Sequence, residues 1–528
     1  MLAVEETLRN AGRRLYAWCR AERWPFVVAV LIAAAVHYPI YAYQLRNMDS
    51  LHVGNLYVAD EWEFNPYWET EQGRWGLRLM DMLRGGINLP PLGALLMLLF
   101  YVLAGILVVR LFGLRSRVAR FLVPVLVACS PYVAEVETFH YCSAAYGLSF
   151  LLAVAAVYGA VCAPPRWGWA VGGLCLMFSL SMYQASLGVA AGLCLMMLLL
   201  QVLRTPHAVG EWLCRLRSMV LMGLAGGAAY YVVLKLFLKL YDTSLFGSFA
   251  NGPVEILKGV PQGLVNAYRD FAVYFAKNYT IAQNYYGQRI AYLALAVVLL
   301  VVLVRWLAAI RQTSTTVLTV VMLALLPAAV NITDILNANT HIELRMAGAL
   351  ILVVPFCLAL IEHAPRVDLN RLPWAVVAGG VCALVLLRGY VVQINNDAMV
   401  MLAQKNKIVN LANRICVQLE QNEDYQAGAQ VCILGEPQKG MYDTVSPLTE
   451  KASDLAQFGL LSFDPTFNSR GWHSLYWEEL GIELNWCSDE QTRALCATDT
   501  FQEMPSYPQE GSIQTIDGVV VVKVAEIQ

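Results

Sequence analysis

Long apolar runs separated by short polar connections occupy the first three quarters of the chain. An α-helix needs about 20 such residues to cross the hydrocarbon core of a bilayer. The runs fall at 25–43, 88–109, 118–134, 143–163, 168–183, 185–203, 218–240, 287–304, 315–331, 346–361 and 373–393. We therefore predict about eleven membrane-spanning helices. Tyr183 and Gln184 interrupt the stretch 168–203, whose division into spans stays open.

The pattern changes after residue 394, where polar residues occur throughout. A helical pattern over 396–420 precedes a strand-like run, AQVCILGEP, and a second such run, DGVVVVKVAE, nearly ends the chain. A tail of roughly 130 residues is large enough to fold as one small domain. We predict a membrane module over 1–394 and an α/β domain over 395–528.

Composition agrees with a membrane protein. The 528 residues are 58% hydrophobic and only 14% charged, and the mean hydropathy is +0.52. This balance excludes a typical soluble enzyme, and a net charge of −2 gives no reason to expect a nucleic-acid partner. The run 25–43 is too long for the hydrophobic part of a signal peptide. We interpret it as a retained first span.

The distribution of positive charge predicts the orientation. A cytoplasmic N-terminus puts the following residues in short inner connections: Arg110, Arg115, Arg117, Arg120, Arg166, Arg204, Arg215, Arg217, Arg305, Arg311, Arg366 and Arg371. The longer outer segments hold fewer: Arg46, Arg74, Arg78, Arg84, Lys258, Arg269, Lys277 and Arg345. Cytoplasmic connections are the ones enriched in Lys and Arg. An odd number of spans then puts the tail outside, with large outer loops at 44–87 and 241–286.

Four of the 13 cysteines lie in the tail, at Cys416, Cys432, Cys487 and Cys496. An even number in an outer domain suggests two disulfides, with three ways of pairing them. We favour Cys487–Cys496 as one pair because the loop between them is short. A zinc site is the weaker reading, since no Cys-x-x-Cys motif or nearby His supports it.

The first outer loop contains NLYVADEWEFNPYWETEQGRWGLRLMD, with adjacent carboxylates at Asp60 and Glu61. A structural interpretation is an amphipathic helix on the membrane surface, with Arg74 and Arg78 one turn apart touching lipid headgroups. Asp60 would then cap this segment.

A catalytic interpretation explains why carboxylates, cations and aromatic residues meet at the membrane surface. Transfer of a sugar from a lipid phosphate needs a carboxylate that takes the proton of an acceptor hydroxyl. It also needs a guanidinium that holds the leaving phosphate and aromatic faces on which the sugar stacks. The loop contains all three.

The chain resembles the GT-C membrane glycosyltransferases, in which an acidic pair follows the first span. ADEW, GRW, the span opening at LPPL, SMYQASLGV over 181–189 and LRMAG over 344–348 are similar to the bacterial GtrII glucosyltransferase family, which includes O-antigen serotype-converting enzymes. The likeness extends over most of the chain, although its motifs comprise only about 30 residues. That family has two aspartates where this chain has Asp60 and Glu61.

The resemblance implies a GT-C fold and an inverting transfer of glucose, or another hexose, from a polyprenyl phosphate to a surface glycan such as O-antigen. The reaction would occur at the outer face of the bacterial cytoplasmic membrane. Asp60 matches the general base, and Glu61 would orient the acceptor or tune its neighbour. Arg74 matches the GRW arginine, and Arg345 matches the late-loop arginine, our preferred phosphate clamp. Donors with one lipid phosphate generally require no metal.

Two further outer clusters supply candidates. The segment PYVAEVETFHY places Glu135, Glu137 and His140 at the next outer turn, where the acids would bind acceptor hydroxyls or, with Asp60, a divalent metal; the alternative is a solvated loop with an incidental His. In VYFAKNYTIAQNYYGQR, Lys277 and Arg289 belong to a sugar-binding lip or to an interfacial belt of tyrosines. With Arg78, these residues complete the expected substrate-binding set.

Three other functions compete. A lipid-linked sugar flippase or transporter predicts ionisable residues within spans and an internal repeat, neither of which stands out. A polysaccharide polymerase would share the spans and the outer arginines, but would not need the early acidic pair. A receptor anchored by the membrane part would not need eleven spans.

Overall fold

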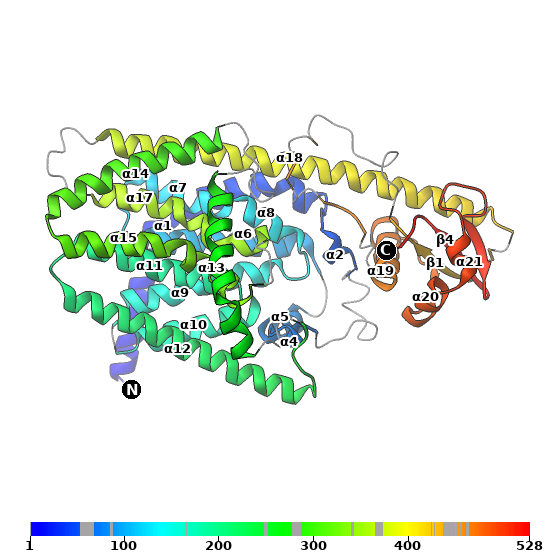
Figure 1. Ribbon diagram of the computed structural model, residues 1–528, viewed down its shortest axis with the longest axis horizontal. Helices are drawn as coiled ribbons and strands as arrows, with labels where there is room; N and C mark the ends of the chain where they lie inside the picture. The colour runs from blue at the N-terminus through cyan, green and yellow to red at the C-terminus, as the bar shows by residue number, and fades with distance from the viewer. Residues whose placement is uncertain are drawn as a thin grey trace.

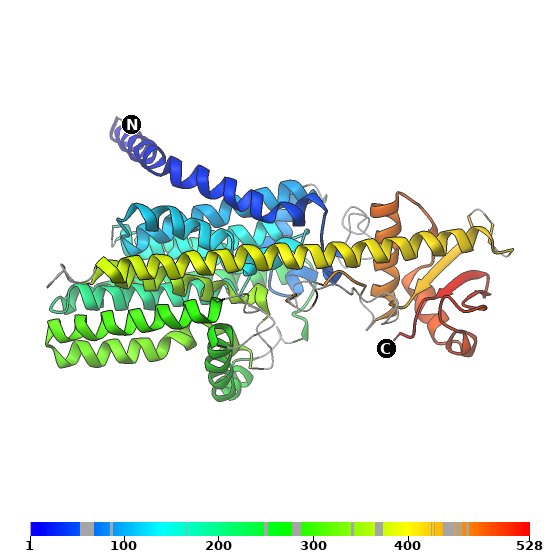
Figure 2. The ribbon, with the colours of Figure 1, turned by 90° about the horizontal axis from the view of Figure 1, so that it is seen from above.

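The computed structural model describes residues 2–527 with these gaps: 53–67, 85–87, 165, 248–251, 277–286, 339–342, 365–372, 424, 427, 437–448, 450–451, 454–456 and 461–463. A bundle of long helices forms one end of the molecule and a small sheet-containing tail forms the other (Figure 1). Helix α18 (Pro373–Glu420) runs the length of the bundle and continues into the tail (Figure 2).

The bundle consists of α1 (Leu2–Ala42), α6 (Pro90–Phe112), α7 (Arg117–Ala128), α8 (Pro131–Thr138), α9 (Ser143–Cys162), α10 (Gly168–Met182), α11 (Ser186–Arg204), α12 (Val209–Leu240), α14 (Gln288–Ile310), α15 (Thr313–Val330), η2 (Leu344–Leu352), α17 (Val353–His363) and α18. Within the described residues, ten helical segments are long and apolar enough to cross a membrane. The predicted polytopic helical membrane protein is therefore confirmed.

The predicted span 168–183 differs from the others, because it forms a helix of only 15 residues, α10. Gly172 and Gly173 lie on the sides of α10 that face α9 and α12. A Cβ atom at Gly172 would lie 2.5 Å from the carbonyl oxygen of Ala156. The missing side chains thus allow α10 to pack closely between its two neighbours.

The short helices α2 (Met48–His52), α4 (Trp68–Glu71) and α5 (Trp75–Arg84) lie at the end of the bundle nearest the tail, here called the tail end (Figure 1). Two further helices, α13 (Pro253–Ala276) and α16 (Ile332–Leu336), pack on each other. Helix α13 lies across the direction of the bundle helices (Figure 1). It forms within the long loop expected at 241–286.

The tail contains β1 (Gln430–Leu434), α19 (Pro465–Leu475), η5 (Tyr476–Leu480), β2 (Asn485–Trp486), α20 (Asp489–Cys496), α21 (Asp499–Glu503), β3 (Ile513–Ile516) and β4 (Val519–Lys523). The four strands form one sheet in the order β2-β1-β4-β3. Strand β1 runs parallel to β2 and to β4, whereas β3 and β4 are antiparallel. Both strand-like runs are confirmed as β1 and β4. Helix α18 continues through the expected boundary at 394/395, so the position of that boundary stays a prediction.

Ionic contacts hold the tail against the bundle. Arg46, only 4% exposed, follows α1 and pairs with Glu478 and Glu479 of η5. Lys405 of α18 lies 2.7 Å from Glu479 and donates to the carbonyl of Tyr43. Helix α19 also packs on α2. The tail therefore contacts the segment that leads into residues 53–67.

All four tail cysteines are free thiols in the structure, so the expected Cys487–Cys496 disulfide is not formed there. The Cys432 thiol instead donates to Oγ1 of Thr492 at 3.9 Å, and the Cys487 sulfur lies 3.4 Å from the same oxygen. Cys432 is on β1 and Cys487 directly follows β2, and the sequence spacing of the cysteines does not predict that these two lie close together.

Candidate active site

The GRW motif forms a tight turn against the tail end of the bundle. Gly73 has φ +78°, and a Cβ atom there would lie 2.6 Å from the Tyr230 hydroxyl and 2.8 Å from Nε2 of Gln184. Tyr230 donates to the carbonyl of Gly73 at 2.9 Å. Gln184 donates to the carbonyl of Gln72 at 2.6 Å. Only glycine fits this conformation and this space.

Trp75 begins α5 and fixes that helix inside the protein. It is 2% exposed, stacks on Phe237 of α12 with ring centroids 5.4 Å apart, and contacts Phe178 of α10. An amphipathic helix on the membrane surface would direct Trp75 toward lipid, so that structural interpretation is wrong for this residue. Leu83, near the other end of α5, is 82% exposed.

Arg74 lies between the turn and three bundle helices. Its Nη1 donates to the Tyr146 hydroxyl at 3.0 Å, and its Nε donates to Oε1 of Gln184 at 3.4 Å. The guanidinium also lies 5.6 Å from the ring centroid of Tyr183, and the Tyr183 ring stacks on that of Tyr146 at 4.0 Å. These contacts fix a permanent cation at the tail end.

Arg345 approaches the same tyrosine from the far part of the chain. The Tyr183 hydroxyl donates to the carbonyl of Arg345 at 2.9 Å. The Arg345 side chain is 30% exposed, pairs with Glu343, and lies 4.0 Å from Glu135. Its guanidinium also covers the Phe139 ring at 4.9 Å. The structure thus brings two residues of the expected substrate-binding set into contact with one tyrosine: Arg74 through its guanidinium and Arg345 through its backbone carbonyl.

Glu137 and His140 do not form the solvated loop or open acidic cluster that the sequence allowed. Glu137 is 1% exposed, and its carboxylate lies 2.6 Å from Nδ1 of His37 on α1. His140 is 9% exposed, and its Nε2 donates to the carbonyl of Leu45. Burial, followed by the charge of Arg46, lowers the pKa of His140 to about 3. Both residues therefore join α8 and its following turn to the end of α1.

The remaining candidates are dispersed. Asp60, Glu61 and Lys277 lie outside the described residues. Arg78 is half-buried on α5, one turn beyond Arg74. Arg289 is exposed in the first turn of α14, a helix that packs mainly on α18. The structure therefore does not bring Arg289 to the helices that surround Arg74.

An apolar pocket of about 360 Å³ lies between α5 and the first turns of α6. Its lining is Leu77, Met80, Leu83, Leu89, Leu92, Gly93, Leu96, His140, Tyr141, Cys142, Ala144 and Ala145. Tyr141 and Cys142 are close enough to Arg74 to interact with its charge. Leu83, Leu89 and Leu92 are each more than half exposed. The pocket thus connects the surroundings of Arg74 with the apolar outside of the bundle.

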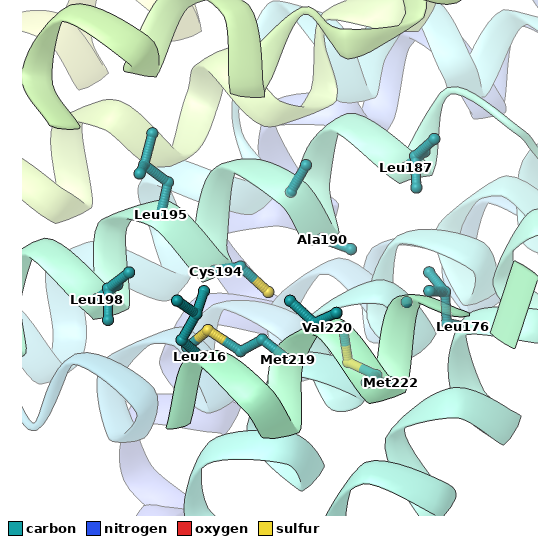
Figure 3. Close-up of a pocket in the computed structure, with 12 residues that line it drawn as sticks. Leu176, Leu187, Ala190, Cys194, Leu195, Leu198, Leu216, Met219, Val220 and Met222 are labelled. Atoms are coloured by element: carbon teal, nitrogen blue, oxygen red, sulfur yellow. The ribbon is translucent and has the colours of Figure 1, made fainter. Parts of the chain in front are cut away.

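A second pocket, of about 320 Å³, lies between α10, α11 and α12. Figure 3 shows Leu195 and Leu198 of α11 facing Leu216 and Val220 of α12 across it. All of its lining residues are apolar, and the Cys194 thiol is the most reactive side chain among them. It contains no group for acid–base chemistry or for binding a phosphate.

Two buried carboxylates meet where α13 packs on α16. Asp334 is fully buried and Asp270 is 4% exposed, and Nε of Arg269 donates to Asp270 at 2.9 Å. Burial, and then the charge of Asp270, raise the pKa of Asp334 to about 7. Within the described residues, no three His, Cys, Asp or Glu side chains are grouped so as to hold a metal ion.

Sequence reasoning missed the polar side chains that hold Arg74. In the sequence, Tyr183 and Gln184 are recognisable as an interruption between spans and as part of the motif SMYQASLGV, but neither feature indicates a contact with Arg74. Tyr146 and Tyr230 lie inside apolar runs, where nothing distinguishes them from other tyrosines. Only the packing of α9 and α12 around the turn reveals their role.

The model of one protein family, described as glucosyl transferase GtrII, matches residues 53–356, which is more than half of the 528-residue chain. No curated protein matches the chain, and no solved structure does so either. The matched region begins directly after α2 and ends within α17, so it includes Asp60, Arg74, Tyr183 and Arg345.

Proposed function

The chain belongs to the GtrII family of glucosyl transferases, and on this premise we propose that it transfers glucose, or another hexose, from a polyprenyl phosphate to a cell-surface glycan such as O-antigen. The proposed site is the outer face of the bacterial cytoplasmic membrane, and the proposed architecture is of the GT-C type. The observation that carries the proposal is the convergence of Arg74 and Arg345 on Tyr183.

The proposed reaction is a single displacement. An acceptor hydroxyl oxygen attacks the anomeric carbon from the face opposite the phosphate, and the bond from that carbon to the phosphate oxygen breaks. Asp60 takes the hydroxyl proton as general base. The leaving polyprenyl phosphate gains a negative charge, which Arg74 and Arg345 stabilise through charge-assisted hydrogen bonds. Glu61 orients the acceptor.

The pocket between α5 and α6 supports a lipid donor. Its polar end lies at Tyr141 and Cys142, close to Arg74, and its other walls are leucines that reach the outside of the bundle. A phosphate near Arg74 would leave the first isoprene units in this pocket and the rest of the chain among lipids. Burial of such units contributes about 0.8 kcal/mol per CH₂.

Charge at the two ends of the bundle supports the proposed orientation. Exposed or half-exposed arginines lie at the end opposite the tail, among them Arg115, Arg166 and Arg215. Lys and Arg are enriched on the cytoplasmic side of membrane proteins. On this basis the N-terminus is cytoplasmic, and Arg74, Arg345 and the tail face outward.

The proposed division of labour puts catalysis in residues 1–394 and acceptor selection in the tail, 395–528. Its support is the contact of η5 with Arg46 and of α19 with α2. Both contacts lie on the segment that directly precedes residues 53–67, which include the proposed base Asp60.

The test is transfer by purified protein in proteoliposomes, from radiolabelled polyprenyl-phosphate-glucose to a panel of surface glycans. We expect transfer by the wild type, loss of it in a folded Asp60→Asn, and a raised KM for the donor in Arg74→Lys, because lysine lacks the planar fork. Arg166→Ala, at the opposite end, is the matched control and keeps full activity.

Two outcomes would contradict the proposal. Equal transfer by wild type and Asp60→Asn would remove the proposed base. Absence of transfer from glucose, galactose and mannose donors, together with movement of the lipid-linked sugar across the vesicle bilayer, would favour a flippase.

A further inference from the structure

We propose that the mature protein contains a disulfide between Cys432 and Cys487 that joins β1 to β2, and that Cys496 remains a thiol. The proposal rests on the outward orientation given above, because disulfides persist in oxidising compartments and are rare in the cytosol. It does not depend on which sugar the enzyme transfers.

The register of the sheet puts the two cysteines opposite each other. Val431 of β1 pairs with Trp486 of β2, and the N–H of Cys487 donates to the carbonyl of Val431 at 3.1 Å. The next position on each parallel strand is therefore Cys432 and Cys487. Neighbouring strands lie roughly 4.8 Å apart, within the range of about 4.4–6.8 Å between Cα atoms that a disulfide allows.

The side chains already meet on the same face of the sheet. Cys432 is fully buried and Cys487 is 8% exposed, and both belong to one small hydrophobic cluster. Both sulfurs lie near Oγ1 of Thr492, at 3.9 and 3.4 Å respectively, and they are close enough for each thiol to shift the pKa of the other.

Cys487 is suited to be the attacking sulfur. The neighbouring Cys432 thiol lowers the pKa of Cys487 to about 7, which increases the thiolate fraction at neutral pH. The oxidant is a thiol–disulfide oxidoreductase in its disulfide form. The Cys487 thiolate attacks it to form a mixed disulfide and releases one oxidoreductase thiolate. Cys432 then loses its proton and attacks the Cys487 sulfur, releasing the second thiolate.

The balance is two electrons and two protons transferred from the cysteine pair to the oxidoreductase. Because both sulfurs are buried in the folded tail, the oxidoreductase must reach them after β1 and β2 have paired, when the two thiols are adjacent, and before the rest of the tail covers them. Once formed, the bond is protected from reductants. The bridged segment between the two cysteines contains α19 and η5, so the disulfide also restrains the element that contacts Arg46.

Cys496 and Cys416 lack this geometry. Cys496 is the last residue of α20, is not part of a strand, and packs at the edge of the same cluster. Cys416 is on α18 and packs in the larger core. The pairing therefore follows strand register and not the length of the intervening loop.

The experiment is peptide mapping of full-length protein purified from membranes without reductant, after free thiols are blocked with N-ethylmaleimide in denaturant. Trypsin cleaves after Arg493 and separates Cys487 from Cys496, and a glutamate-specific protease cleaves after Glu420 and separates Cys416 from Cys432. We expect a peptide that links Cys432 to Cys487 and a blocked Cys496. A Cys487–Cys496 link, or complete blocking of all four thiols, would overturn the pairing.

A second measurement does not depend on mapping. Closing a loop of this length should raise the melting temperature of the tail by about 10 °C. We expect Cys432→Ser, Cys487→Ser and the double variant to lower it equally, whereas Cys496→Ser leaves it unchanged. Equal melting temperatures for the double variant and the wild type would contradict the bond.

Protease accessibility of the tail in spheroplasts separates this proposal from the proposed function. If the tail faces outward and all of its thiols react with N-ethylmaleimide, only the disulfide proposal is overturned. A tail on the cytoplasmic side overturns both proposals, because the assumed donor side and the oxidising compartment are then wrong.

Discussion

Tyr183 and Arg345 are joined by a hydrogen bond of 2.9 Å from the phenol to the backbone carbonyl, and the same phenol ring lies 5.6 Å from the guanidinium carbon of Arg74. One side chain therefore contacts the guanidinium of Arg74 and the backbone of Arg345, which are 271 positions apart in the sequence. A rigid spacer of this kind reduces the reorganisation needed when an anion binds between cations.

Tyr183→Phe tests this spacer. The ring and its stacking on Tyr146 remain, but the carbonyl of Arg345 loses its donor, which costs about 1–3 kcal/mol for a buried acceptor. We expect kcat/KM for the lipid donor, measured on folded protein, to fall roughly tenfold or more, together with a lower melting temperature. Tyr158→Phe, on the distant half of α9, is the control and keeps wild-type kinetics. An unchanged kcat/KM in Tyr183→Phe would remove Tyr183 from the site.

Gly73→Ala addresses the turn that presents Arg74. A methyl group there would meet the Tyr230 hydroxyl at 2.6 Å, and a positive φ costs a non-glycine residue about 1–3 kcal/mol. We expect loss of most transfer activity and a lower melting temperature. Gly227→Ala, where a Cβ atom would have no neighbour within 4 Å, should change neither quantity. Full activity in Gly73→Ala would show that the turn tolerates rearrangement.

Hydropathy predicted the spans because a long run of apolar residues identifies a span without knowledge of which helices it packs against. Ten of the eleven runs became helices long enough to cross a membrane, and the exception, α10, ends early at Tyr183. Helix α13 was not predicted, because Pro261 lies within it and its apolar residues cover only one face, so it has no continuous apolar run.

The site was less predictable because its contacts join distant segments. The motifs identified Arg74 and Arg345, but no pattern indicates that Tyr146 and Tyr230 surround the GRW turn. Glu137 was expected in an outer cluster because it follows a span, yet it pairs with His37, about 100 positions away. Periodicity indicates which face of a helix is apolar, but not which helix covers it.

The contact between tail and bundle depends on Arg46. Its carboxylate partners, Glu478 and Glu479, are 14% and 11% exposed. Removing one partner of a mostly buried ionic group typically costs about 3–5 kcal/mol. We therefore expect Arg46→Ala to make the tail easier to cleave from the bundle by limited proteolysis. Arg493→Ala, which removes an exposed arginine on α20, is the control.

Reversing the charges on both sides of this contact should restore the attachment of the tail to the bundle. Arg46→Glu should release the tail as Arg46→Ala does, and combining it with Glu478→Arg and Glu479→Arg should restore resistance to the protease. A triple variant as sensitive as Arg46→Glu would show that charge pairing does not hold the tail.

The raised pKa of Asp334 in the folded protein predicts how the stability of the protein varies with pH. Its folded pKa is raised to about 7 by burial and by Asp270, whereas an unfolded aspartate titrates near about 3.9. Between these values the folded protein binds one more proton than the unfolded chain, so stability falls as the pH rises from about 4 to 7. The wild type should therefore melt at a lower temperature at pH 8 than at pH 5.

Asp334→Asn isolates this carboxyl group from other titrations, because asparagine cannot lose the proton. We expect the variant to gain melting temperature relative to the wild type at pH 8 and to gain much less at pH 5, measured in detergent with intrinsic fluorescence. Asp242→Asn, which changes an exposed aspartate after α12, should show no such pH-dependent difference. A gain from Asp334→Asn that is the same at both pH values would mean that the buried pair of α13 and α16 does not titrate in this range.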